Sequence, residues 1–183
     1  TKETAVDDND VLGRINFQAP LESSGSDAIL AGGAIWGEAE ATFAAANNST
    51  SLVFGTNSIG TASERMRINS VGNVGIGVVP EAWSATYDAL QIGGGGSIFS
   101  HASGGGDASM FIGQNVYNDG AWNYINENES SFIQFKNGTI QFATAASDVA
   151  DATISFTYPM KLDINSRISL SNNDSGGTGG DDS

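Results

Sequence analysis

The alternation of polar and apolar residues between Ile154 and Leu170 constrains the fold more than any other feature of this sequence. Eight of the nine even positions are apolar, and no odd position holds a bulky hydrophobe. A period of two is typical of β-strands with one buried face. Because strands usually extend for only about 5–6 residues, the run predicts successive strands that keep one face inward and bend at Pro159 or Asn165.

The segment from Met66 to Val78 alternates in the same phase, and Ile68-Asn69-Ser70 recurs as Ile164-Asn165-Ser166. Two related β modules are therefore expected, at residues 11–80 and 88–172, joined by a connector at 81–87. The polar ends, 1–10 and 173–183, are expected to be a flexible lead-in and tail. The apolar residues of the two runs are predicted to face a shared interior: Met66, Ile68, Val74, Ile76, Ile154, Phe156, Leu162, Ile164, Ile168 and Leu170.

The composition favours an all-β chain that associates with copies of itself. Gly, Ser, Asn and β-branched residues interrupt nearly every window long enough for a helix. Bulky hydrophobes stand singly between small polar residues, so one copy buries little apolar surface. Association of several copies would supply the missing burial.

The charge balance excludes several classes of function. The chain carries 7 Lys and Arg against 21 Asp and Glu, a net charge of −14. Nucleic-acid binding needs a basic face, and so does attachment to anionic membranes; no apolar run is long enough to span a membrane. There is no cysteine, which rules out disulfides and thiolate metal sites. No motif indicates a cofactor or a metal: Gly72–Gly77 lacks the ending of a phosphate loop, and its glycines predict close strand packing.

Enzymatic chemistry has weak support in the sequence. His101 has Ser100, Ser103 and Asp107 nearby, but such close spacing rarely gives a catalytic triad. The pairs Glu38/Glu40 and Glu127/Glu129 would project from one strand face about 6–7 Å apart, a separation compatible with glycoside hydrolysis. Exposed acids on a polar strand are much commoner. We therefore expect no enzyme, with a polysaccharide depolymerase as the alternative.

Glycan binding is the better-supported kind of site. Sugar sites combine an aromatic ring with neighbouring amide or carboxylate groups, and residues 117–124 contain these components. The alternative is that the rings fill a small β core and that Asn118-Asp119-Gly120 forms an ordinary hairpin turn. The candidate glycan-binding residues are Trp36, Tyr117, Asn118, Asp119, Trp122 and Tyr124.

The run Glu64–Gly77, Glu-Arg-Met-Arg-Ile-Asn-Ser-Val-Gly-Asn-Val-Gly-Ile-Gly, closes at Pro80 and resembles a signature of bacteriophage tail fibres and related virion appendages. The segments Gly13–Phe17, Ala34–Glu38 and Leu52–Phe54 are similar to the region that precedes it. The chain departs from the signature at Val78-Val79, where Thr and Ser are common.

This resemblance implies an elongated homotrimer of intertwined β-strands, as a β-prism, a triple β-helix or small β-sandwich modules, located outside the cell on the virion. Its expected partners are its own copies, other tail fibre or virion proteins, and a glycan or protein of the host surface. A bacterial extracellular fibre or adhesin could share this architecture. The resemblance leaves open whether the chain is a shaft piece, a tip or a cleaved product.

Overall fold

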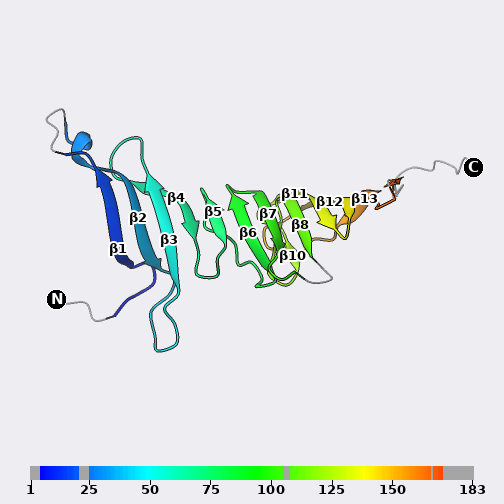
Figure 1. Ribbon diagram of the computed structural model, residues 1–183, viewed down its shortest axis with the longest axis horizontal. Coiled ribbons are helices and arrows are strands. Elements are labelled where there is room, and N and C mark those ends of the chain that lie inside the picture. The colour runs from blue at the N-terminus through cyan, green and yellow to red at the C-terminus, as the bar shows by residue number, and fades with distance from the viewer. Residues whose placement is uncertain (1–4, 21–24, 105–107, 166, 171–183) are drawn as a thin grey trace, which may run out of the picture.

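The computed structural model describes residues 5–20, 25–104, 108–165 and 167–170, which form an elongated and almost entirely β structure (Figure 1). Most of the described strands belong to one twelve-stranded sheet and follow one another along the long axis. The expected all-β fold is thus confirmed. No helix in the described ranges has the length and hydropathy needed to cross a membrane. The sheet contains β1 (Val11–Gln18), β2 (Ala31–Ala39), β3 (Thr50–Thr56), β4 (Ser63–Ile68), β5 (Val74–Ile76), β6 (Tyr87–Ile92), β7 (Gly96–His101), β8 (Ser109–Gln114), β11 (Asn128–Lys136), β12 (Thr139–Asp148), β13 (Thr157–Leu162) and β14 (Ile168–Leu170).

Neighbouring strands of this sheet are antiparallel except β5 and β6, which are parallel. Between β8 and β11 the chain makes a separate hairpin of β9 (Tyr117–Asn118) and β10 (Trp122–Asn123), as the Asn-Asp-Gly turn predicted. A short 3-10 helix, η1 (Asp27–Ile29), lies between β1 and β2. The Asn137-Gly138 loop between β11 and β12 has φ of 51° and 73°, the positive values that a two-residue hairpin loop with matching twist requires.

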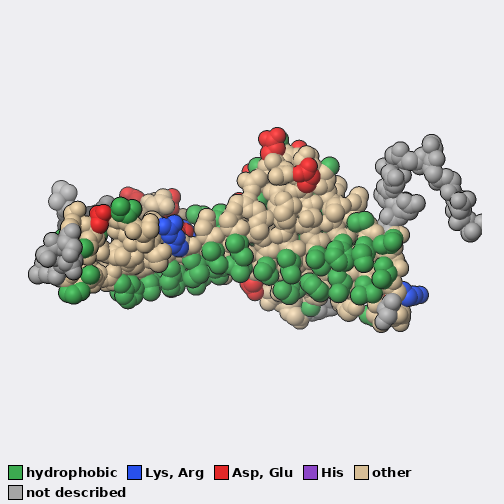
Figure 2. Space-filling view, turned by 90° about the horizontal axis from the view of Figure 1, so that it is seen from above, with side chains coloured by type: hydrophobic (Ala, Val, Ile, Leu, Met, Phe, Trp, Pro, Cys, Tyr) green, Lys and Arg blue, Asp and Glu red, His purple; other side chains and the backbone are tan. Residues whose placement is uncertain are grey.

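One face of the sheet is covered over its second half. We call this face the back face, and we call the segments 80–86, 115–127 and 149–156 the cap. Cap residues share one buried cluster with side chains from β6, β7, β8, β11 and β12. The cap forms the bulge on the second half of the molecule in Figure 2. The cluster consists of Trp83, Val116, Tyr117, Tyr124, Ile125 and Ile154 from the cap with Ala89, Phe99, Phe111, Phe132 and Ala143 from the sheet.

Aromatic rings make up most of this capped core. Phe99 and Phe111, opposite one another on β7 and β8, are stacked with ring centroids 4.6 Å apart. Trp122 of the cap lies 5.3 Å from the Phe111 ring and 5.6 Å from the Phe132 ring. Such ring pairs contribute about 0.5–1.5 kcal/mol each beyond their burial. The first half of the sheet has only a small buried cluster, formed by Ala34, Trp36, Val53 and Ala62.

The glycine-rich run after β4 turns the chain back across the sheet. Gly72 and Gly77 have φ of 92° and 70°, which favour glycine. A Cβ on Gly75 would clash with the carbonyl oxygen of Val78 and lie 2.8 Å from Pro80 Cδ. The close packing predicted for these glycines exists, but the neighbour at Gly75 is the chain's own return segment.

The long alternating run at 154–170 is divided between two layers. Ile154 is buried in the cap cluster, and Phe156 packs against it, whereas β13 and β14 belong to the sheet. The chain bends between Asp163 and Arg167, where the backbone N–H of Asp163 donates to the carbonyl oxygen of Arg167 at 3.0 Å. The bend therefore surrounds Asn165, and Pro159 lies inside β13. Of the predicted segments, the connector at 81–87 lies mostly in the cap. A single sheet runs through both predicted modules. The predicted tail lies outside the described residues.

Candidate functional site

The face opposite the cap, which we call the open face, carries an apolar row that crosses ten neighbouring strands. Each residue of the row is paired in register with the next one on the adjacent strand. Because cross-strand partners lie on the same face, these side chains form one continuous ladder. Its members are Leu52, Ile68, Val74, Leu90, Ile98, Ile112, Ile133, Phe142, Met160 and Leu170.

Shorter apolar rows flank this ladder on both sides. One crosses the first half of the sheet through Ile15, Ile35, Phe54, Met66, Ile76 and Ile92. The other crosses the second half through Met110, Phe135, Ile140, Leu162 and Ile168. In Figure 2 the hydrophobic side chains form a band along the length of the molecule, on the side away from the cap bulge.

Nothing in the described chain covers the open face. Ile98 is 36% exposed while its neighbour Phe99, on the back face, is 2% exposed. Likewise Ile112 is 45% exposed and Phe111 1%. In most half-buried sheets, polar side chains face outward and apolar side chains face the core. In the second half of this sheet, apolar side chains occupy both faces. A contiguous apolar surface of this extent marks an interaction site.

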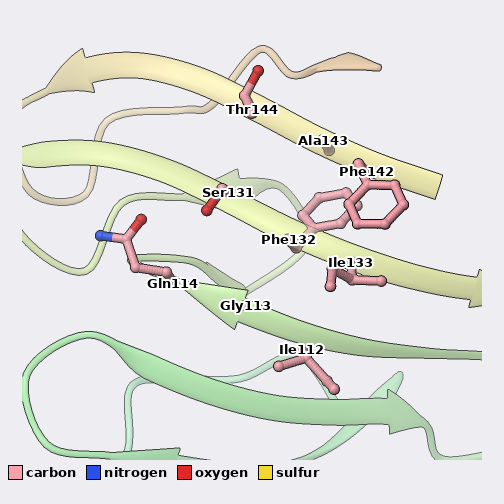
Figure 3. Close-up of a pocket in the computed structure, with 9 residues that line it drawn as sticks. All are labelled: Ile112, Gly113, Gln114, Ser131, Phe132, Ile133, Phe142, Ala143 and Thr144. Carbon is pink, nitrogen blue, oxygen red and sulfur yellow. The ribbon is translucent and has the colours of Figure 1, made fainter. Parts of the chain in front are cut away.

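The open face is shallowly hollowed between its rows. One hollow of about 300 Å³ lies over β8, β11 and β12, where Ile112, Ile133 and Phe142 border Gln114 and Ser131 (Figure 3). A second, of about 440 Å³, is lined mainly by β5 to β8 and includes Leu90, Ile98 and Met110. Hollows bordered by single aliphatic side chains suit interdigitation with another apolar surface.

The structure buries most of the predicted glycan-binding rings. Tyr117 and Tyr124 are 5% and 4% exposed, and Trp122 packs against the capped core. Trp36 is also buried, with the Arg14 guanidinium 4.5 Å above its ring. These rings therefore fill cores, the alternative that the sequence left open, and do not offer an open plate on which a sugar could stack.

The polar atoms of the same residues fix the cap. Tyr117 donates to Asp151 Oδ1 at 2.9 Å, and Tyr124 donates to the carbonyl of Ala146. Burial, followed by the Asp151 carboxylate, raises the pKa of Tyr117 to about 12. Asn118 is buried and its Oδ1 accepts from the backbone of Gly120. Asp119 is exposed at the hairpin turn and accepts from Asn123 Nδ2 at 2.7 Å.

Two of the four carboxylates considered for hydrolysis, Glu38 and Glu40, are engaged in structural bonds in the first half of the sheet. Glu38 accepts from Trp36 Nε1 at 3.0 Å and from Arg67 at 2.9 Å. Glu40 accepts from the hydroxyls of Ser51 and Ser70 and from the Ser70 backbone. Glu127 and Glu129 are exposed. Within the described residues no three His, Asp or Glu side chains are placed to hold a metal ion.

The residues predicted to face a shared interior fall into three places. Seven lie on the open face: Met66, Ile68, Val74, Ile76, Leu162, Ile168 and Leu170. Ile154 and Phe156 belong to the capped core. Ile164 is 72% exposed in the turn before β14, beside Gly138. The central ladder residues Leu90, Ile98 and Ile112 were not predicted from the sequence. Alternation in 88–92 could have revealed Leu90, but Ile98 and Ile112 stand beside the apolar Phe99 and Phe111, so the sequence there does not separate the two faces.

The solved structures similar to this chain include two of the carboxy-terminal domain of the L-shaped tail fibre of bacteriophage T5. The first, which includes an intramolecular chaperone domain, has a TM-score of 0.50 and 11% sequence identity, covering 94% of this chain and 57% of that chain. The second has a TM-score of 0.50 and 11% identity, covering 98% and 86%. The present chain thus spans little more than half of the longer of the two.

No protein-family model matches the sequence, and no curated protein matches it. The structural likeness is therefore one of fold. It bears out the resemblance to phage tail fibres at that level: this chain has the fold of a phage tail fibre domain.

Proposed function

We propose that this chain is a structural segment of a phage tail fibre on the virion, that it works as a homotrimer packed through the open face, and that its outer surface contributes to attachment to the host. The observation that carries the proposal is the uncovered apolar ladder. It runs across ten strands along the fibre direction.

Association through the open face follows from the energetics of that surface. Burying a half-exposed Ile or Leu contributes about 1 kcal/mol, and the three rows provide many such residues in each copy. A rotation about an axis along the sheet brings the ladders of all copies together at the centre. The capped back face then points outward, so each copy supplies one side of a prism.

Host attachment is assigned to the outer surface of the cap. In this arrangement the cap is the part of the chain that projects furthest from the axis (Figure 2). Its exposed surface is polar and acidic, with Asp119, Asn126, Glu127 and Asp151. Such side chains can hydrogen-bond the hydroxyls of a host glycan or the polar surface of a host protein.

The test is the mass of the purified chain in solution, measured by light scattering, for wild type and for Ile112→Asp. The wild type is expected to be a trimer. The substitution places a carboxylate at the centre of the interface, where burial without a partner costs several kcal/mol, so the variant is expected to dissociate at micromolar concentration.

Val149→Asp is the matched control, because Val149 is similarly exposed, at 56%, but belongs to the cap. It should leave the trimer intact. A monomeric wild type, or an Ile112→Asp variant that stays as trimeric as the Val149→Asp control, would contradict the proposed interface.

A further inference from the structure

Two opposite charges stand at opposite margins of the open face. Arg65 is the unpaired residue of a β-bulge in β4, because Met66 pairs with Phe54 and Glu64 with Gly55. It adjoins Met66, which belongs to the shorter row in the first half of the sheet, on the side of that row away from the ladder. Asp88 lies in β6 on the other side of the ladder, two residues before Leu90 and opposite Ser100.

Both side chains are exposed, and neither has a hydrogen-bond or ion-pair partner among the described residues. The neighbouring charges differ in this respect, since Arg67 and Glu64 are paired with one another on the back face. The sequence has no Lys or Arg between Arg67 and Lys136. Asp88 therefore stands in a long stretch of the chain that offers it no cation.

Rotation of copies about an axis along the sheet brings these two margins together. The margin of one open face that carries Asp88 then meets the opposite margin of the next copy, which carries Arg65. Along the axis, β4 and β6 are separated by β5, an offset of about 10 Å from the strand spacing. A long Arg side chain and the twist between strands reduce this gap.

We propose that Arg65 of one copy forms an ion pair with Asp88 of the next copy at each corner of the assembly. The inference rests on the proposed function, since it needs copies joined through their open faces. The pairs set the direction of the copies: parallel copies bring opposite charges together at every corner, whereas reversing one copy places like margins side by side. They also offset part of the repulsion between copies that each carry a charge of −14.

A charge-exchange series tests the pair. Arg65→Glu and Asp88→Arg each place like charges at every corner, and the double variant restores opposite charges with the partners exchanged. An exposed pair changes an equilibrium constant by a factor of about 1.4 to about 5, so three pairs change the trimer association constant by about 3-fold to about 140-fold. Each single variant should dissociate more readily in sedimentation, the double variant should recover, and high salt should remove the difference.

Glu127→Arg, an exposed charge reversal on the cap, is the control and should not weaken the trimer. A second readout uses the absence of cysteine in the chain. Chains with Arg65→Cys are mixed, unfolded and refolded with chains carrying Asp88→Cys, and a short bis-maleimide is added. Cross-links should join the two kinds of chain.

The outcomes separate this inference from the proposed function. A wild-type monomer would remove both. A wild-type trimer in which the double variant is no better than the single variants, and in which Arg65→Cys and Asp88→Cys chains do not cross-link, would overturn the ion pair and leave the interface in place.

Discussion

The two halves of the sheet share an open face but differ in what lies behind it. Behind β6 to β12 the cap encloses an aromatic core in which Phe99, Phe111 and Val116 are almost completely buried. Behind β1 to β5 the described chain places no second layer, and four residues form the buried cluster. The second half has a core of its own, whereas the first half, with its small buried cluster, is expected to gain more from the proposed packing of copies through the open face.

The first half compensates with charge. Arg67 bridges Glu38 at 2.9 Å and Glu64 at 2.6 Å with its side chain only 11% exposed. The hydrogen bond to Glu64 is the main reason that the pKa of Arg67 is raised. Gly55 leaves room for the Trp36 ring beside this network. Such paired charges order the back face, but they stabilise it less than an aromatic core of similar area.

The largest expected effect is at the junction of the two halves. Gly75→Ala should prevent the chain from doubling back after β5, because the new methyl would meet the Val78 carbonyl and Pro80. Both the cap and the parallel pairing of β5 with β6 should be lost. Circular dichroism and the yield of soluble protein measure this loss. Gly95→Ala, where a Cβ meets nothing within 4 Å, should be nearly silent; equal damage from both would dismiss the steric explanation.

A smaller effect, the loss in free energy of unfolding when one buried side chain is shortened, should distinguish the capped core from the small cluster of the first half. Phe99→Ala removes a ring stacked on Phe111 and should lower the free energy of unfolding by about 3–5 kcal/mol. Val53→Ala, at the fully buried centre of the small cluster, should cost about 2 kcal/mol. Urea denaturation measures both values. If Val53→Ala proved the more costly substitution, the first half would be the better-packed region and the comparison would be reversed.

The smallest expected effect is on the pH dependence of the free energy of unfolding, to which a carboxylate in each half contributes with opposite sign. At Glu40 burial favours a higher pKa, but hydrogen bonds from Ser51 and Ser70 outweigh it, so the pKa is lowered. Its contribution to stability is therefore present above the ordinary value of 4.5 and is lost as the pH falls through the lowered value. At Glu81, in the cap, burial and then the Asp151 carboxylate raise the pKa. That contribution is present below 4.5 and is lost as the pH rises through the raised value.

The measurement is the free energy of unfolding from about pH 3.5 to about pH 7 for wild type, Glu40→Gln and Glu81→Gln. Relative to wild type, Glu40→Gln should be most destabilising near neutral pH. Glu81→Gln should be relatively more stabilising there than at low pH. Parallel pH profiles for all three proteins would show that neither carboxylate contributes in this way.

The sequence predicted much of the local structure for physical reasons that hold over short distances. Alternation identified β4, β5, β13 and β14 because a strand exposes successive side chains to opposite faces. Asn118-Asp119-Gly120 predicted its hairpin, because Asn, Asp and Gly favour the backbone angles of a turn. The positions of the predicted glycan-binding rings could not be predicted in this way, because an isolated ring next to Asn looks the same in a sequence whether the ring stands on the surface or in a core.

By itself, then, the sequence determined that the chain is built of strands and that the alternating run at 154–170 bends. The resemblance of the Glu64–Gly77 run to tail fibres predicted the fibre-like fold. Only the tertiary structure decided which alternating residues share a face. Ile154 and Leu162 have the same phase in the sequence, yet the first lies in the capped core and the second on the open face, because the strand register shifts between Thr157 and Met160. Period-two alternation specifies opposite sides of one strand; it does not specify which side a folded cap will cover.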